Sequence, residues 1–529
     1  MDNEFDIRNG ISAEHTGRQH HPLIALLIPF IVIILLCAAG CSDSTAVAAD
    51  PPQNFEYKAD GSGVTITKWV GDGTNVVVPE QLDGLPVTAI GESAFEDCDT
   101  LESVQLPTGM TAIGDFAFDG CISLKNVQLP DSVTSIGTGA FYGCSSLMSV
   151  QFPAGLTDIG VFAFYKCSSM TNVRLPAGVT KIGDHTFYYC SSLMLARLPA
   201  GVTEIGQYAF CGCERMTNVN LPAKLTTIGE AAFYGCESLK RVRIPANVTT
   251  IGDYAFGQCG IWGGIRIPDS VKSIGSHPFE FCRDLKSIRV GSRNENYSSA
   301  NGVLFNKDRS ALVCCPCGKR GEYVIPDSVT VIGDHAFHYC NGLTGVSIPD
   351  SVTVIDRYAF SACDGLSSLD IPDSVTAIGE GAFCACDRLT EISIPNSALD
   401  IGISTFAGDR KLSSVTLPDG LAELPGYMFF ECTSLTNVDI PDSVTAIGES
   451  AFNTCAALNE ITIPAGVTSI GDDAFSRCER LESVHVPDSV TSIGRGVFYD
   501  SPNVTVFCSP VSYAWEYCEN GGIPCRSAE

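Results

Sequence analysis

The chain has 529 residues, of which 45% are hydrophobic and 17% are charged, so it carries enough apolar side chains for a continuous folded core. Its formal net charge of −28 at pH 7 argues against wholesale binding to nucleic acid, because a phosphate backbone repels an acidic surface. A chain of this length forms either several globular domains or one repeated unit.

The first predicted element is an apolar segment near the N-terminus. Residues 23–40 read LIALLIPFIVIILLCAAG, a run that approaches the hydrocarbon thickness of a bilayer. The run ends at Ala38-Ala39-Gly40-Cys41, which resembles the lipobox of bacterial lipoproteins, and this resemblance implies lipidation of Cys41 after cleavage. Two other interpretations stay open: an uncleaved membrane anchor, and ordinary signal-peptide cleavage near Ala46-Val47-Ala48 followed by secretion.

Basic residues flank this segment on one side. Arg8 and Arg18 precede it, and no Lys or Arg follows it before Lys58. Because the flank richer in Lys and Arg stays in the cytoplasm, the rest of the chain is predicted to lie outside the cell.

A phenylalanine then recurs with a period of 23 residues. Nine copies run from Phe95 to Phe279, and eight more run from Phe337 to Phe498 after a gap of 58 residues. A typical copy reads I-G-x-x-A-F-x-x-C-x-x-L-x-x-V-x-L-P-x-x-V-T, as in Ile113 to Thr134, and its period lies within the range of leucine-rich repeats.

Each copy is expected to form one coil of a solenoid. The alternation at the end of L-x-x-V-x-L predicts a short strand that pairs in parallel with the next copy, and the proline ends that strand. Gly114 is expected to permit a tight corner, and A-F-x-x-C is long enough for one helical turn. The predicted fold is a β-rich, curved, right-handed leucine-rich-repeat solenoid of about 18 coils, with a parallel sheet on its concave face and β-rich end caps.

Copies such as IPDSVTAIGESAFNTCAALNEITIP (Ile440 to Pro464) resemble the BspA-like leucine-rich repeats of bacterial surface proteins. The segments Asn54 to Val70 and Tyr513 to Pro524 are similar to that family's β-rich entry cap and exit segment. The stretch Asn294 to Gly318 resembles its inserted module, in which NKDRS predicts a hairpin turn between two strands. The resemblance implies adhesion to host proteins or to other cells.

These elements divide the chain into eight segments. They are an N-terminal cytoplasmic region (1–22), a signal peptide or membrane anchor (23–41), a linker (42–52), a β cap (53–85), a first repeat block (86–290), an inserted irregular module (291–325), a second repeat block (326–510) and a C-terminal cap (511–529).

The residues that flank the inward Val or Ile of each strand are predicted to point outward on the concave face. In the middle coils these positions become basic, although the chain as a whole is acidic. Arginine's planar fork suits carboxylate, sulfate or phosphate, so we predict a ligand-binding patch for an acidic protein segment or an anionic glycan. The alternative is a set of solvated positions neutralised by neighbouring acids. The patch comprises Arg174, Arg197, Arg241, Arg243, Arg266 and Arg289.

Fifteen of the 25 cysteines occupy one repeat position, three residues after the phenylalanine, and Asp409 and Ser501 replace two others. They are interpreted as buried free thiols that pack as small hydrophobes, with disulfides between adjacent coils as the alternative. Cys314, Cys315 and Cys317 form a compact C-C-P-C cluster, but no second cysteine pair lies in the insertion, so no metal is assigned to them. Near the C-terminus, a disulfide among the cysteines Cys508, Cys518 and Cys525 stays open.

The histidines carry no predicted chemistry. His185, His277 and His335 share the position two before the repeat phenylalanine, which is interpreted as a variable surface position. The closeness of His335, His338 and Cys340 is interpreted as coincidence. The sequence contains no G-x-S-x-G, Walker, H-E-x-x-H or EF-hand motif.

Function is therefore expected to be binding rather than catalysis, without cofactor or metal. The predicted protein is tethered to a membrane at the cell surface and adheres to extracellular or host proteins, or to anionic glycans, but not to nucleic acid. The alternative is a structural, self-associating envelope protein, for which Cys211 and Cys384 are expected to be exposed contacts.

Overall fold

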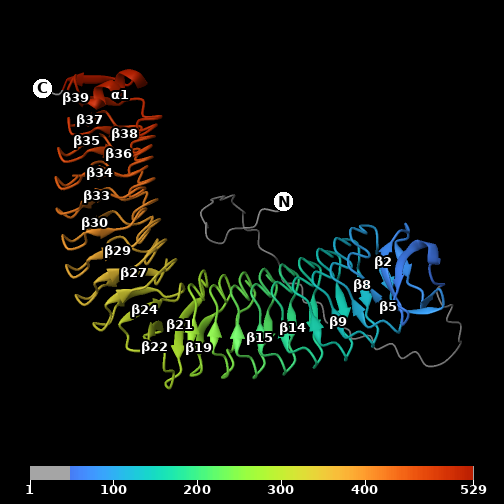
Figure 1. Ribbon diagram of the computed structural model, residues 1–529. Helices are drawn as coiled ribbons and strands as arrows, with labels where there is room; N and C mark the ends of the chain where they lie inside the picture. Colours follow the sequence, from blue (N-terminus) through green and yellow to red (C-terminus); the bar gives the residue numbers. More distant parts are fainter. Residues whose placement is uncertain (1–47, 528–529) are drawn as a thin grey trace, which may run out of the picture. The chain divides into compact units, whose positions relative to one another are not determined.

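Each repeat forms one coil, and most coils contribute short strands to two parallel ladders (Figure 1). The computed structural model describes residues 48–527, which belong to one compact unit. Strands of successive coils pair with an offset of one repeat, as in Val127 with Val150 and Ile136 with Ile159. The predicted parallel-strand solenoid is thereby confirmed, with about 20 turns and little helix.

The first ladder is formed by the predicted L-x-x-V-x-L strands. In β8 the central Val127 is buried while Asn126 and Gln128 are exposed, so the period-two pattern holds. The strands of this ladder are β3 (Asn75–Val77), β6 (Ser103–Gln105), β8 (Asn126–Gln128), β10 (Ser149–Gln151), β12 (Asn172–Arg174), β14 (Leu195–Arg197), β16 (Asn218–Asn220), β19 (Gly263–Ile267), β21 (Leu285–Val290), β25 (Gly321–Val324), β27 (Leu343–Ser347), β30 (Glu391–Ser393), β32 (Ser414–Thr416), β35 (Glu460–Thr462), β37 (Ser483–His485), β39 (Thr505–Cys508) and β40 (Cys525–Ser527).

A second ladder, not predicted from the sequence, is formed by the two residues that end at the repeat Ile. These pairs are too short to show an alternation, so periodicity alone gives no signal for them. Its strands are β7 (Ala112–Ile113), β9 (Ser135–Ile136), β11 (Asp158–Ile159), β13 (Lys181–Ile182), β15 (Glu204–Ile205), β17 (Thr227–Ile228), β18 (Thr250–Ile251), β20 (Ser273–Ile274), β26 (Val331–Ile332), β28 (Val354–Ile355), β29 (Ala377–Ile378), β31 (Asp400–Ile401), β33 (Glu423–Leu424), β34 (Ala446–Ile447), β36 (Ser469–Ile470) and β38 (Ser492–Ile493).

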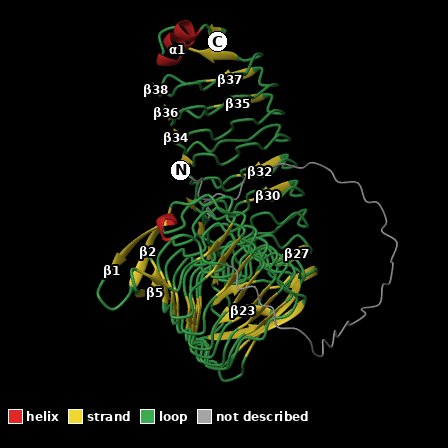
Figure 2. Ribbon diagram, turned by 90° about the vertical axis from the view of Figure 1, so that its right-hand side faces the viewer, coloured by secondary structure: helices red, strands yellow, loops and turns green. Residues whose placement is uncertain are grey.

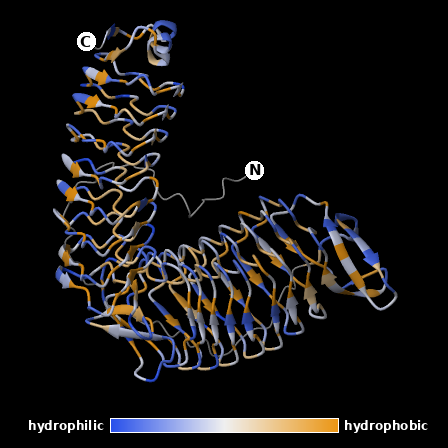
Figure 3. Ribbon diagram, turned by 60° about the vertical axis from the view of Figure 1, so that its left-hand side comes forward, coloured by the Kyte–Doolittle hydropathy of each residue, from blue (hydrophilic) through white to orange (hydrophobic). Residues whose placement is uncertain are grey.

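The repeat phenylalanines form the centre of the core. Neighbouring rings within each block stack with centroids 4.8 to 6.0 Å apart, from Phe95 to Phe279 and again from Phe337 to Phe498. Hydrophobic and hydrophilic residues alternate along the coils around this stack (Figure 3). Because a single coil has no way to cover its own apolar face, stacking of coils is the main source of buried area.

The glycine after the repeat Ile is needed for close packing of successive coils. Gly114 does not adopt a left-handed φ. A Cβ at this position would lie 2.6 Å from the carbonyl carbon of Gly91 in the preceding coil, so the glycine is needed for close approach of the two backbones. The left-handed φ occurs two residues later instead, at Phe116 (φ 54°) and at His185 (φ 55°) in a later coil.

The inserted module separates two core clusters. The strands β22 (Tyr297–Ala300), β23 (Val303–Asn306) and β24 (Ala311–Cys314) form an antiparallel meander, which confirms the predicted hairpin at NKDRS. Strand β24 then pairs in parallel with β26 and so starts the second ladder of the following block. Leu304 packs in the first cluster, whereas Val303 and Phe305 pack in the second.

The N-terminal end of the solenoid is β-rich. The strands β1 (Phe55–Ala59) and β2 (Val64–Trp69) are antiparallel, and β4 (Gln81–Leu82) forms a hairpin with β5 (Leu85–Ile90). Strand β2 pairs in parallel with β5, which leads into the second ladder.

The C-terminal end contains a helix where β structure was expected. Helix α1 (Tyr513–Gly521) begins after Ser512, whose hydroxyl accepts a hydrogen bond from the Trp515 amide, and it ends at Gly522 in a left-handed conformation. Both are common helix-capping residues, and β40 follows them. Within residues 48–527, helix occurs only in α1 and the short η1 (Pro52–Asn54), as Figure 2 shows.

None of the helices in residues 48–527 has the length and apolar character needed to cross a membrane. The predicted apolar segment and the predicted lipidation site at Cys41 lie outside the described residues.

Candidate functional site

Two of the predicted arginines lie side by side on adjacent parallel strands. Arg174 ends β12 and Arg197 ends β14, and the two residues are paired in register. Together with the Leu-Pro-Ala segments that follow them, they line an open hollow of about 430 Å³. These two neighbouring coils therefore place an arginine at the same point of the first ladder, beside an apolar Leu-Pro-Ala segment.

A second pair has the same geometry. Arg266 of β19 and Arg289 of β21 are in register on the next part of the first ladder. Between the two pairs, Arg241 and Arg243 lie in a segment without assigned strand, so the predicted run of strands is interrupted there. All six arginines are exposed, and within residues 48–527 none of them forms an ion pair with an acidic side chain.

The interruption exposes a tryptophan that was not among the residues predicted from the sequence. Ile261 takes the buried position that leucine holds in other coils, which turns Trp262 outward with 61% of its surface exposed. The backbone then shifts register at Gly263, which has a left-handed φ of 83°. The Trp262 amide donates to the carbonyl of Lys240, 3.1 Å away, so the Trp262 backbone lies beside the segment that leads into Arg241. The signal in the sequence was Ile261, which stands one position before the usual repeat leucine and is followed by W-G-G.

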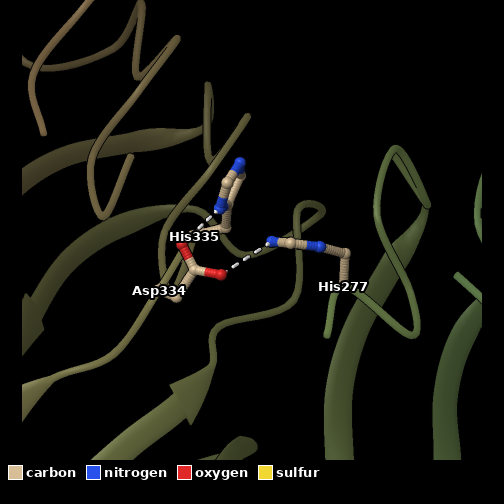
Figure 4. A group of neighbouring side chains, drawn as sticks. All are labelled: His277, Asp334 and His335. Atoms are coloured by element: carbon tan, nitrogen blue, oxygen red, sulfur yellow. Dashed lines mark hydrogen bonds and ion pairs between the residues drawn. The ribbon is translucent and has the colours of Figure 1, made fainter. Parts of the chain in front are cut away.

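A cluster of histidines lies where the inserted module begins and ends (Figure 4). The Asp334 carboxylate is 2.9 Å from His335 Nδ1 through one oxygen and 3.6 Å from His277 Nε2 through the other. The His277 and His335 rings are 3.8 Å apart between centroids. The His277 side chain is only 8% exposed, so the interpretation of this position as a plain surface position is wrong here.

Burial and proximity set the charges in this cluster. Burial, together with the neighbouring His335, lowers the pKa of His277 to about 4, so its imidazole is neutral at pH 7. Burial is the largest single influence on Asp334 and favours its neutral form. The hydrogen bond from His335 and the charge interactions with His335, His277 and Arg357 together outweigh burial and hold the pKa of Asp334 below its usual value. Next to them, His338 Nε2 lies 3.1 Å from Glu280 Oε1.

The repeat cysteines have a polar contact that packing arguments alone do not predict. The Cys236 thiol donates to the carbonyl oxygen of Phe210, 3.3 Å away, and the same bond recurs along both blocks. Ser501 keeps this contact through its hydroxyl at 2.8 Å, which explains why serine replaces cysteine there. All 23 cysteines in the described part of the chain are free thiols.

Two cysteines expected at the surface are buried. Cys211 is 3% exposed and Cys384 is 7% exposed, so the prediction that they are exposed contacts for self-association is wrong. Both lie one residue after the repeat phenylalanine, and the Cys384 thiol is 3.1 Å from the Ser361 hydroxyl of the preceding coil. The turn that follows the phenylalanine folds these side chains against the neighbouring coil.

The clustered cysteines of the module do not form a ligand set. The Cys317 thiol contacts the carbonyl of His338, and the Cys314 thiol contacts the carbonyl of Cys315. Among residues 48–527, the His277, Asp334 and His335 side chains are the one group of three or more potential ligands whose donor atoms all lie within 4.8 Å of one another.

Parallel ladders with one repeat per coil and a stacked phenylalanine core define a leucine-rich-repeat solenoid. The sequence matches the family model of the BspA type leucine rich repeat region over residues 75–194, 180–301, 313–408 and 382–505. The chain therefore belongs to the BspA-type leucine-rich-repeat family, which confirms the resemblance seen in the sequence. No protein of curated function matches the sequence significantly.

Several solved structures are similar. A leucine-rich repeat protein from Bacteroides ovatus is 25% identical, with a TM-score of 0.51, over 85% of this chain and 99% of that chain. A leucine-rich repeat protein from T. pallidum is 38% identical, with a TM-score of 0.35, over 36% of this chain and 91% of that chain. A leucine rich cell surface protein from Faecalibacterium prausnitzii is 26% identical, with a TM-score of 0.37, over 92% of this chain and 100% of that chain.

The family sets the broad class of function. Its members are typically cell-surface proteins, and solenoids of this kind typically serve as non-enzymatic scaffolds that bind other proteins.

Proposed function

We propose that the protein is a membrane-tethered, extracellular adhesion protein that binds acidic ligands through the arginine face, defined as Arg174, Arg197, Arg241, Arg243, Arg266 and Arg289. The proposal assigns it no catalytic step. The observation that carries it is the in-register pairing of exposed, unpaired arginines in a chain with a net charge of −28.

Electrostatics supports a ligand on this face. Like charges in register on neighbouring strands are unfavourable, and they lie about 4.8 Å apart at the usual strand spacing. The alternative, that nearby acids neutralise them, finds no support, because no ion pair involves these six side chains within residues 48–527. A bound anion would relieve the repulsion and gain charge-assisted hydrogen bonds.

The geometry favours an extended anionic ligand. Arginine forks at successive coils offer repeated bidentate contacts to carboxylate, sulfate or phosphate groups. The exposed Trp262 ring beside this face adds an apolar surface of the kind found at binding hot spots. An acidic protein segment or a sulfated or carboxylated glycan fits this combination.

The N-terminal segment supports the tether. The apolar run at residues 23–40 and the lipobox-like ending at Cys41 favour export followed by lipidation, with an uncleaved anchor as the second route. Metabolic labelling with a radioactive fatty acid tests this directly. Label that disappears in Cys41→Ser supports the lipoprotein, whereas an unlabelled, membrane-bound full-length chain supports the anchor.

Ligand capture tests the arginine face. The fragment 48–529 is presented to matrix proteins, mucins and anionic glycans at two salt concentrations, beside the triple variant Arg197→Glu, Arg243→Glu and Arg266→Glu. We expect saturable, salt-sensitive capture that falls at least about tenfold in the variant, a loss of about 1.4 kcal/mol or more.

A control variant with the same change in net charge tests whether a loss of capture comes from the arginine face or from the overall charge. The control carries Lys224→Glu, Lys272→Glu and Arg477→Glu at exposed positions outside the first ladder. Capture that is unchanged in both variants contradicts the arginine face. No capture by the parent fragment, together with a mass that rises with concentration, favours the structural, self-associating alternative instead.

A further inference from the structure

The inserted module separates two repeats in the sequence, yet one side of these two repeats is in direct contact. In regular coils, the rings two residues before the phenylalanine stack on the next coil, as in His185 with Tyr208 at 4.8 Å between centroids. His277 and His335 lie 58 residues apart in the sequence, yet their centroids are 3.8 Å apart. The module adds strands between them but no copy of the A-F turn. The Cys315 amide, one residue after β24, donates to the Ala336 carbonyl, a contact that a repeat phenylalanine makes in regular coils.

At this junction, the His277 ring has two buried nitrogen atoms that lack hydrogen-bond partners. Its side chain is 8% exposed, and neither ring nitrogen forms a hydrogen bond. Its Nε2 points at the Asp334 carboxylate from 3.6 Å, beyond hydrogen-bonding distance (Figure 4). Leaving a buried polar atom unpaired costs about 1–3 kcal/mol, and such atoms in native proteins usually indicate a bound water or ion.

We propose that His277, Asp334 and His335 bind one divalent transition-metal ion of the zinc class. Two imidazoles and one carboxylate are a common ligand set for this ion, and three protein ligands leave a fourth position for water or an external ligand.

The donor atoms are close enough to bind the ion with small side-chain movements. They all lie within 4.8 Å of one another, whereas tetrahedral zinc with bonds of about 2.0–2.1 Å places its ligand atoms about 3.3 Å apart. Arg357 Nε lies 3.9 Å from Asp334, but its side chain is 61% exposed and has room to turn into solvent.

Surrounding groups orient the ligands. His338, which lies 4.9 Å from the His335 ring between centroids, is held by Glu280 at 3.1 Å. Packing of this kind limits the orientations open to the His335 ring.

The position suggests a structural role for the ion. His277 precedes Phe279 at the end of the first core cluster, and Asp334 and His335 precede Phe337 near the start of the second. An ion held by both sides connects the two clusters across the module. Because it binds the folded state alone, it raises the stability of the junction by an amount that grows with metal concentration.

The test uses the full chain, stripped of metal with a chelator and titrated with Zn²⁺ and Co²⁺ in a calorimeter. The variants His277→Asn and His335→Asn are chosen because asparagine tolerates the left-handed φ of both positions, 55° and 53°. His185→Asn is the control, since it occupies the same repeat position with φ 55° in a regular coil.

We expect one ion per chain, a rise in melting temperature with Zn²⁺, and a loss of affinity of at least about 100-fold in either site variant but not in the control, more than a supporting group alone would cost. The Co²⁺ complex should show tetrahedral d–d bands without thiolate charge-transfer bands. Absence of stoichiometric binding, binding that survives His277→Asn, or a thiolate spectrum each overturns the proposal, and the last assigns the ion to the module cysteines instead.

Discussion

The thiol of Cys213 donates a hydrogen bond to the carbonyl oxygen of Phe187, and the Sγ–O distance is 3.3 Å. Both residues are buried, and the bond connects one coil with the preceding coil. The repeat cysteine therefore serves as a hydrogen-bond donor as well as a small apolar side chain.

Cys213→Ser should be tolerated better than Cys213→Ala. Serine keeps the donor, as Ser501 does at 2.8 Å from Phe475, so its cost should stay below about 1 kcal/mol. Alanine loses the bond and leaves a small cavity, at a cost of about 1–2 kcal/mol. Urea denaturation of both variants measures the difference; a larger loss for serine would mean that the position is purely apolar.

Gly160→Ala should destabilise the solenoid by about 1–3 kcal/mol, since a Cβ there would lie 2.5 Å from backbone atoms of Gly137 and Thr138. Gly155→Ala is the matched control, because its Cβ would approach nothing closer than 3.7 Å. Melting temperatures of the two variants give the comparison. Equal stability would show that the coils separate easily enough to admit a methyl group.

Asp409→Ser should stabilise the protein, and more so at pH 7 than at pH 4. Asp409 is fully buried, one carboxylate oxygen has no hydrogen-bond partner, and burial raises its pKa well above the usual value. Below the unfolded pKa of about 3.9 both states are protonated; as the pH rises, the unfolded state ionises first and folding loses free energy.

The expected gain from Asp409→Ser at pH 7 is about 1–3 kcal/mol by chemical denaturation. Asp400→Ser, at an exposed carboxylate, provides the control and should change stability by no more than about 0.5 kcal/mol. A gain that does not depend on pH would indicate that the carboxylate is not the source of the penalty.

Trp262→Ala should weaken ligand capture without lowering the melting temperature, because the ring is 61% exposed and lies outside the core. The comparison is Tyr499→Ala, at a ring that is 64% exposed in the last repeat copy. We expect at least about a fivefold loss for Trp262→Ala, in line with an aromatic contact of 1 kcal/mol or more. Equal capture by both variants would remove Trp262 from the binding surface.

Cys98 should react first among the fifteen repeat cysteines with an alkylating reagent. It is half-buried, whereas the other fourteen are buried. Burial also raises the pKa of buried members such as Cys478, to about 12, which suppresses the reactive thiolate. Mass spectrometry after brief alkylation identifies the order of labelling. Early labelling of Cys236 would indicate that the middle coils open faster than the first.

The coils were predictable because one period repeats throughout the chain. Val127 and its equivalents alternate with polar neighbours, so the first ladder could be predicted. The pair Ser135–Ile136 is too short to carry a pattern, and helix α1 was missed although Ser512 and Gly522 mark its ends. The arginine patch could be proposed from the sequence because basic residues at outward strand positions are unusual in a chain with a net charge of −28.

The histidine cluster was not predictable in the same way. His277 and Asp334 meet only because the module omits a turn between them, and nothing local to either residue indicates this. The exposure of Trp262 was not predictable for a related reason. A single bulge decides which of Ile261 and Trp262 enters the core.

Contacts between regular coils connect residues 20 to 26 positions apart, as in Tyr234 with Tyr254 and Cys167 with Phe141. Each coil therefore depends on its two neighbours and on nothing further along the chain. Gain or loss of one whole repeat within a block would leave every remaining contact in register and shift only the distance between the ends. The length of such a protein is thus free to vary in steps of one repeat, and the reach of whatever it carries varies with it.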